Sequence, residues 1–291
     1  MLLSNPQVVQ LLNTQFVPYW ESVRPVPKVT IDFGNGHKMQ RTLMGNTVMY
    51  LCLPNAQVVD ALPGVYTPED FLRETNKTLT FLQQLSSAPE EERTFSRVAS
   101  TLAAWHRGQV EEALLRERQR ITFSKSFVES PLLNALGIPA VDRPQVAQKA
   151  VGERAGEGKA VLLPANTAPA MLKSASRERL VTAFQSLSSQ MVDISKRAAT
   201  VQQLEQNLQI AGKGTPPTPE QLGREVVRLD SRNNVNTMRP AVHVLLATYS
   251  TPPTPKSCRD ILYKQLLHVP LDDPNLGLAD ALVPGTPHEK Q

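Results

Sequence analysis

The sequence predicts an α/β N-terminal region followed by a mainly α-helical remainder. Three observations predict this fold class. Residues 1–85 alternate short helical and extended patterns, separated by turns that contain glycine and proline. Residues 86–136 have a helical apolar stripe, and residues 176–210 carry a long heptad pattern. Because 291 residues is about twice the usual length of a single domain, we expect more than one folded unit.

Composition and charge exclude several classes of protein. Apolar residues make up 41% of the chain and charged residues 20%, which is typical of a globular protein. The net charge of +4 (31 Lys+Arg against 27 Asp+Glu) is too small for a nucleic-acid-binding surface. No run of 18 apolar residues and no signal-peptide pattern occurs. As written, the chain is expected to be cytoplasmic without a membrane span, and extracytoplasmic if the true start lies upstream of Met1.

A short helix is expected at the start of residues 1–85. Apolar residues recur near helical spacing between Val8 and Phe16, after the cap-type residue Asn5. Four extended pieces follow, VPYWESVRPV, VTIDFGNGHKM, TVMYLC and QVVDAL, with a hairpin turn at LPNAQ. TVMYLC has little polar interruption, which predicts a buried central strand. Thr67 and Pro68 then predict the start of a closing helix.

This order of elements resembles the thioredoxin-like superfamily from its active-site helix onward. The segments NTQFVPYW and GNTVMYLCLPNAQVVDALPGVYTPEDFL carry the resemblance. Members of the family show a Gly-x-Pro-Thr segment, two strands joined by a turn, a glycine and a terminal helix, and residues 45–85 are similar. The resemblance implies a partial or degenerate thioredoxin-like domain in residues 1–85.

Two departures from the family bear on activity. The family's Cys-x-x-C pair would precede the first helix, and nothing in this sequence stands in its place. Disulfide exchange needs a thiolate of low pKa with a resolving partner. In addition, Asn46 stands where the family has its cis-proline, so substrate docking at that position is in doubt. The resemblance therefore implies no dithiol chemistry, unless the Cys-x-x-C segment lies upstream of Met1.

Single residues offer weaker signals. Cys52, at the end of TVMYLC, is the candidate thiol; it is either a reactive single thiol or, as we favour, a small core residue. The chain's other cysteine, Cys258, is too distant in sequence to predict a disulfide. Four aromatic residues form either a recognition surface or, as we favour, packing contacts. They are Tyr19, Trp20, Tyr50 and Tyr66.

In the middle of the chain, the helix in residues 86–136 is expected to run to about residue 120, with Gly108 as a candidate interruption. His106 is interpreted as an exposed or hydrogen-bonded histidine rather than a ligand. Residues 137–175 are interpreted as a connector. The stretch GERAGEGK lacks the spacing of a phosphate-binding loop.

The heptad pattern predicts one long amphipathic helix over residues 176–210. Its seam alternates by four and three residues. The seam residues are Leu180, Phe184, Leu187, Met191, Ile194, Ala198 and Val201. We favour an intramolecular helical hairpin with residues 94–120; the alternative is a coiled coil with a second copy or a partner.

Residues 211–278 predict a small helical region, and residues 279–291 a flexible tail. Helix starts are expected at Thr237 and Thr254. Polar residues between the helices are expected to cap helix ends, an anion site being the alternative; they are Arg232, Asn233, Asn234, Asn236 and Arg239. Five residues of ligand type have no zinc-site spacing, so no metal is predicted; they are His243, Cys258, His268, Asp272 and Asp273.

The leading prediction is a non-catalytic binding or adaptor protein of the thioredoxin-like kind. No catalytic residue and no cofactor is predicted, because no dithiol, triad, phosphate loop or metal motif occurs in the sequence. A protein partner or self-association is expected. The alternative is a protein related to thiol–disulfide oxidoreductases, either through an upstream Cys-x-x-C segment or through Cys52 alone.

Overall fold

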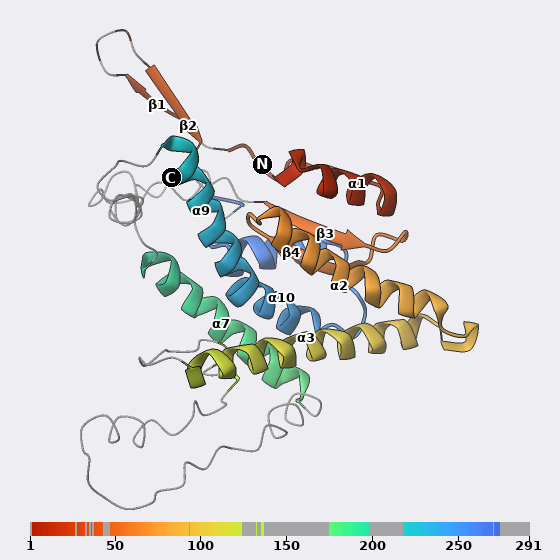
Figure 1. The fold of residues 1–291 in the computed structure, drawn as a ribbon. Coiled ribbons are helices and arrows are strands. Elements are labelled where there is room, and N and C mark those ends of the chain that lie inside the picture. The colour runs from red at the N-terminus through yellow and green to blue at the C-terminus, as the bar shows by residue number, and fades with distance from the viewer. Residues whose placement is uncertain are drawn as a thin grey trace, which may run out of the picture.

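The fold is mixed α/β and mostly helical (Figure 1). A computed structural model describes the residues at positions 2–26, 28–32, 34, 36, 38–42, 47–92, 94–123, 132, 135–136, 175–197, 218–269 and 271–273. Of the sequence predictions, Asn46, nearly all of the connector and the tail lie outside these residues.

The N-terminal helix forms as the sequence predicts. The short 3₁₀ turn η1 (Leu2–Ser4) leads into α1 (Pro6–Gln15), whose cap Asn5 accepts hydrogen bonds from the backbone N–H groups of Gln7 and Val8. An extended segment without regular structure follows. The strands β1 (Lys28–Asp32) and β2 (Lys38–Thr42) then form an antiparallel hairpin, which lies apart from the other two strands in Figure 1.

The second antiparallel pair consists of β3 (Val48–Cys52) and β4 (Val58–Pro63), joined by the predicted turn. Leu51 lies opposite Asp60, and every residue of β4 is buried. The expectation that TVMYLC is a central strand is wrong for the described residues, because β3 pairs there with β4 alone. The strand is also less buried than its apolar composition predicts, because Leu51 is its one buried residue and Cys52 is exposed.

Two long helices follow the sheet. Thr67 caps α2 (Pro68–Ser87) by accepting from the Asp70 N–H. After the turn η2 (Glu90–Glu92), α3 (Phe95–Phe123) continues through Gly108 without a break. A single glycine costs a helix only about 1 kcal/mol, which the packing of a 29-residue helix offsets.

The heptad helix is present as α7 (Arg177–Arg197). Its seam residues Leu180, Phe184 and Leu187 are buried, whereas Ala198 and Val201 lie outside the described residues. The expected hairpin with residues 94–120 is replaced by a different arrangement. Helix α7 packs chiefly on α10, and α10 in turn packs on α3.

The C-terminal region contains one long helical path and one short helix. Helix α9 (Pro219–Asn233) passes through a π-helical turn, η3 (Asn234–Met238), directly into α10 (Arg239–Leu246). Thr237 therefore starts no helix, because it lies within the π-helical turn η3, in the middle of the continuous helical path. Thr254 does cap α11 (Pro255–Ile261), which continues into the π turn η4 (Leu262–Leu266).

Helix α10 lies at the centre of the molecule, between the β3–β4 pair and the helices α3 and α7 (Figure 1). The largest apolar cluster joins Val58 and Ala61 of β4 to residues of α3, α7, α10 and α11. A second cluster on the other face of the sheet contains Val8 of α1, Leu51 of β3 and Phe71 of α2. Both faces of the two-stranded sheet are thus covered by helices.

Candidate functional site

A buried ion pair joins β4 to α10. Asp60 and Arg239 are 0% and 2% exposed. The guanidinium binds both carboxylate oxygens, with Nη1 2.5 Å from Oδ1 and Nη2 2.8 Å from Oδ2. Bidentate arginine–carboxylate pairs are among the strongest hydrogen-bonded arrangements in proteins. The pair therefore fixes the position of α10 against the sheet.

The same two side chains also satisfy the outward-facing backbone of Ala61. The N–H of Ala61 donates to Asp60 Oδ1 over 2.8 Å, and its carbonyl oxygen accepts from Arg239 Nη1 over 2.7 Å. In a wider sheet, a neighbouring strand would make both of these bonds. The ion pair takes the place of that strand at Ala61, and the Pro253 carbonyl accepts from the outward N–H of Val58 over 2.7 Å further along the same edge.

Two residues of α2 complete this network. The Thr78 hydroxyl donates to Asp60 Oδ2 over 2.6 Å, and a Glu74 carboxylate oxygen lies 3.6 Å from Arg239 Nε. Burial by itself raises the pKa of Asp60, but the Arg239 charge outweighs it and holds that pKa well below its usual range. Burial likewise lowers the pKa of Arg239, and the Asp60 carboxylate more than reverses this. Both groups are charged at neutral pH.

A histidine pair lies in the adjoining interface between α3 and α10. His106 and His243 are 0% and 3% exposed, and their Nδ1 atoms are 2.9 Å apart. One Nδ1 donates and the other accepts, so the accepting ring is neutral. Burial lowers the pKa of His106 to about 4, and burial together with the Arg239 charge lowers the pKa of His243 well below its ordinary value. The pair is therefore uncharged at neutral pH.

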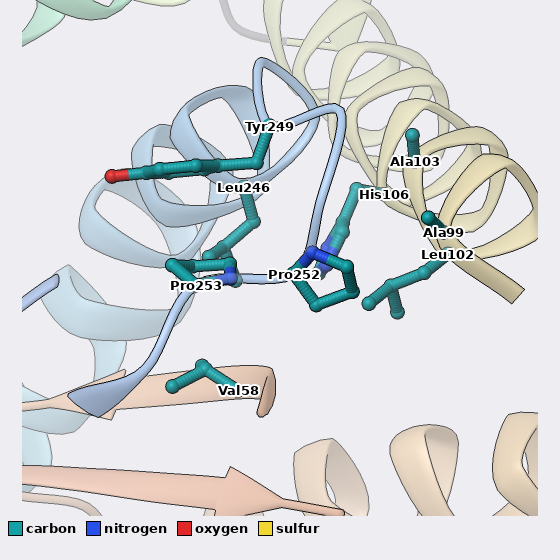
Figure 2. A pocket seen from close by; sticks show the side chains of 9 residues that line it. All are labelled: Val58, Ala99, Leu102, Ala103, His106, Leu246, Tyr249, Pro252 and Pro253. Carbon is teal, nitrogen blue, oxygen red and sulfur yellow. The ribbon is translucent and has the colours of Figure 1, made fainter. Parts of the chain in front are cut away.

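His106 also borders a narrow pocket between α3, α10 and β4 (Figure 2). The other lining residues are mostly apolar, and the Tyr249 hydroxyl points away from His106 in Figure 2. The pocket volume of about 10 Å³ is the room of about one water molecule. The pocket is therefore too small for a substrate.

A larger groove of about 510 Å³ lies between α2 and α3. The stacked rings of Phe81 and Trp105, 4.8 Å apart, line part of it. The Lys77 ammonium, which also lines it, is 2.9 Å from the Glu112 carboxylate. Since this charge is already paired, Lys77 does not make the groove an anion site.

The outer edge of β3 contrasts with the closed edge of β4. Thr47 and Leu53, at the two ends of β3, bond to the β4 side over 2.7 and 2.8 Å. Alternation along the strand then turns the backbone groups of Tyr50 and Cys52 away from β4. Among the described residues, no hydrogen bond reaches the outward N–H or C=O of either residue. The same alternation turns the N–H of Val48 outward, where it donates to the Tyr263 side chain. Among the described residues, the part of this edge that is open to a further strand is therefore at Tyr50 and Cys52.

An exposed apolar segment follows α1. Val17, Tyr19 and Trp20 are 96%, 86% and 81% exposed. The expectation that Tyr19 and Trp20 are packing contacts is therefore wrong, because neither side chain is covered. The same expectation is confirmed for Tyr66, which is fully buried, and Tyr50 is half-buried against the core.

The candidate thiol Cys52 lies at the end of β3, and the residue is exposed. Partial burial of the thiol group raises its pKa. Burial, followed by the influence of the Cys52 thiol, raises the pKa of Cys258 to about 12. A raised pKa lowers the thiolate fraction at neutral pH, and the thiolate is the nucleophile in redox chemistry. This geometry gives no support to a single-thiol enzyme.

The sequence alone did not identify the polar residues that pair at the centre of the molecule. Arg239 was expected among helix-capping residues, but its side chain is buried and pairs with Asp60. Of the two alternatives for His106, the hydrogen-bonded one is confirmed and the exposed one is wrong, and the sequence did not identify its partner His243. One signal was present: an aspartate within the apolar strand VVDAL, and an arginine and a histidine within the apolar helix RPAVHVLL, each need a buried partner.

Within the described part of the chain, no group of three or more histidine, cysteine, aspartate or glutamate side chains is arranged to hold a metal ion. No helix among those residues is both long and apolar enough to cross a membrane. Comparison of the chain with protein-family models, with curated proteins and with solved structures finds no match.

Proposed function

We propose that this chain is a non-catalytic protein-binding module of the adaptor kind, and that residues 17–20 are its main contact. The observation that carries the proposal is the exposure of Val17, Tyr19 and Trp20, which ranges from 81% to 96%. Single exposed apolar residues are common on protein surfaces. A contiguous exposed stretch is typical of an interaction site, and tyrosine and tryptophan are enriched at the energetic centres of interfaces.

The backbone of this segment favours binding. The residue before it, Phe16, has an extended conformation, with φ −134° and ψ 160°. Pro18 fixes one further backbone dihedral in the segment. A segment restricted in this way loses less conformational entropy when it binds. The two aromatic side chains add large contact areas with few rotatable bonds.

The proposal includes a thioredoxin-like origin for the N-terminal region, without its dithiol. The elements α1, β3, β4 and α2 support this, because they follow the order in which the resemblance places a helix, a hairpin and a closing helix, although the β1–β2 hairpin intervenes between α1 and β3. The redox alternative has less support. The pKa of the Cys52 thiol is raised by burial, whereas a reactive thiol needs a lowered one.

The experiment that tests the proposal is site-specific photo-crosslinking in the source cells. A photoreactive phenylalanine analogue replaces Trp20 in one variant and Arg228, an exposed residue of α9, in the control. We expect a discrete adduct with another protein from position 20 and none from position 228. The purified adduct partner should bind Trp20→Ala at least about 10-fold more weakly than the unchanged chain. Absence of the adduct, or unchanged binding by Trp20→Ala, would contradict the proposal.

A further inference from the structure

We infer that the outer edge of β3 accepts an extended strand of the partner protein, which adds a third strand to the β3–β4 sheet. The inference rests on the proposed function and deepens it, because it names the structure that the partner presents. Exposed strand edges carry a row of unpaired backbone groups and are known docking sites for extended peptides.

The two outer edges of the sheet differ in the hydrogen bonding of their backbone groups. Ala61 and Tyr50 lie opposite each other, and their outward backbone groups face opposite edges. The outward N–H of Ala61 donates to Asp60, and its carbonyl accepts from Arg239. Among the described residues, no hydrogen bond reaches the outward N–H or carbonyl of Tyr50.

The edge of β4 is bonded at Val58, by the Pro253 carbonyl, and at Ala61. The edge of β3 is bonded at Val48, by Tyr263, which leaves Tyr50 and Cys52 as its open end among the described residues. An added strand is therefore directed to that end of β3.

The exposed segment borders this open edge. At its start, Phe16 packs on the apolar cluster that also contacts Met49 of β3. Just beyond its end, Glu21 lies near Arg259. The pKa of Arg259 is raised by its hydrogen bond to Asp260 and further by two nearby groups, the Glu21 carboxylate and Tyr50 of β3. Arg259 is thus near both the end of the exposed segment and β3. Residues 17–20 therefore connect two points that both adjoin β3.

The flanking helices decide which occupant fits. Leu51 packs with Val8 of α1 on one face of β3, and Tyr50 packs against the cluster that contains Cys258 of α11 on the other. Paired strands lie about 4.8 Å apart, whereas a helix with its side chains is about 10 Å wide. A second copy that paired through its own β3 would bring its own α1 and α11 to the same two faces, beside the helices already there. A single extended segment has no such helices.

The chemistry of the added strand follows from its surroundings. Apolar clusters adjoin β3 on both faces of the sheet. A strand that is covered on both faces is a continuous apolar run rather than an alternating pattern. We therefore expect the partner segment to be a short run rich in valine, isoleucine and similar β-forming residues.

A synthetic peptide tests this inference on the whole chain. The probe has a central Val-Ile-Val-Ile run flanked by lysines, and its matched control carries N-methyl groups on alternate residues, in both registers, which remove the donors needed for pairing. We expect the probe to slow hydrogen exchange at the Tyr50 and Cys52 amides by at least about 10-fold. The N-methylated peptides should leave both amides unchanged.

A pair of variants gives an independent readout. Cys52→Ser removes the thiol but keeps the outward N–H, and should bind the probe as the unchanged chain does. Cys52→Pro removes that N–H and should bind at least about 10-fold more weakly, and a thermal melt of each variant reports whether it is folded. No slowing of exchange at millimolar probe, or equal slowing by the N-methylated peptides, overturns the inference. If that occurs while crosslinking at Trp20 succeeds, the proposed function stands and strand addition alone is wrong.

Discussion

Arg239 on α10 and Asp60 on β4 form a buried pair that performs the work of a neighbouring strand. Two nitrogens of the guanidinium bind the carboxylate, and one of them also donates to the backbone carbonyl of Ala61. Helix α10 contacts α3, α7 and β4. A single side-chain pair therefore both satisfies the edge of β4 at Ala61 and attaches the sheet to the central helix.

Replacing Arg239 with methionine should reduce the free energy of unfolding by about 3–5 kcal/mol, because it leaves the Asp60 carboxylate buried without its counter-charge. Urea unfolding of the purified variant measures this. The control is Arg228→Met, which breaks an exposed pair with Glu225 on α9 and should change stability by no more than about 0.5 kcal/mol. Equal effects of the two substitutions would show that the buried pair contributes no more to the free energy of unfolding than the pair on α9.

Adding Asp60→Leu to Arg239→Met should cost less than the sum of the two single changes, by at least about 1 kcal/mol. The reason is that the double variant leaves no unpaired charge in the interior. A double-mutant cycle built from urea unfolding curves gives this coupling directly. Additive effects would mean that Asp60 and Arg239 act independently.

The histidine pair predicts a loss of stability in mild acid. The folded-state pKa of His106 is about 4 and that of His243 is well below its ordinary value, whereas both are near 6.5 in the unfolded chain. The unfolded state therefore binds more protons below pH 6.5, so this contribution to stability is complete above pH 6.5 and declines as the pH falls toward 4.

Thermal melts between pH 7.5 and 4.5 test the contribution of these histidines. The double variant His106→Leu/His243→Leu should be less dependent on pH in this window than the unchanged chain, while His268→Gln, at a half-buried site, should retain the dependence. An unchanged slope in the double variant would show that other groups cause the acid sensitivity.

Two glycines predict opposite effects of the same substitution. Gly64 has a φ of 81°, and a Cβ there would lie 2.6 Å from the side-chain nitrogen of Asn234. Gly64→Ala should therefore destabilise the chain by about 1–3 kcal/mol. Gly108, in the middle of α3, has open space around it, and Gly108→Ala should stabilise by about 0.5–1 kcal/mol. Chemical unfolding of both variants measures the change in the free energy of unfolding. Changes of the same sign in the two variants would contradict these predictions.

The thiols should show unequal accessibility and low reactivity. An aromatic disulfide reagent should modify Cys52 in the native chain, and Cys258 only after unfolding, because Cys258 is buried. Modification of Cys52 at pH 7 should be slower than that of an unfolded thiol, since burial raises its pKa. Rapid modification at pH 7, or reduction of a model disulfide that Cys52→Ser abolishes, would favour the redox alternative.

Local features of the fold could be predicted from the sequence where one residue type has one physical role. Asn5, Thr67 and Thr254 cap helices as expected, because a side-chain oxygen before a helical run has a backbone donor to accept from. The hairpin at residues 48–63 also forms as expected, whereas the extended piece VTIDFGNGHKM contains a second hairpin, at residues 28–42, that was not predicted. The thioredoxin-like resemblance and the coiled coil stay predictions.

The contacts between distant segments could not be predicted. Asp60 and Arg239 are far apart in the chain, and without a fold neither residue identifies the other as its partner. The heptad seam of α7 predicted that Leu180, Phe184 and Leu187 are buried, but a pattern does not specify the helix that covers them. Tyr19 and Trp20 show the converse, because aromatic residues pack in most contexts and only the surroundings reveal that they are exposed.

Hydrogen exchange at single amides of the free protein, measured by NMR, tests most directly whether the edge of β3 is open at Tyr50 and Cys52. The amides of Tyr50 and Cys52 are expected to exchange far faster than that of Ala61, which is bonded to Asp60. Fast exchange is also expected for Tyr19 and Trp20. If the Tyr50 amide is instead as protected as that of Ala61, the edge of β3 is already occupied, and strand addition by a partner is wrong.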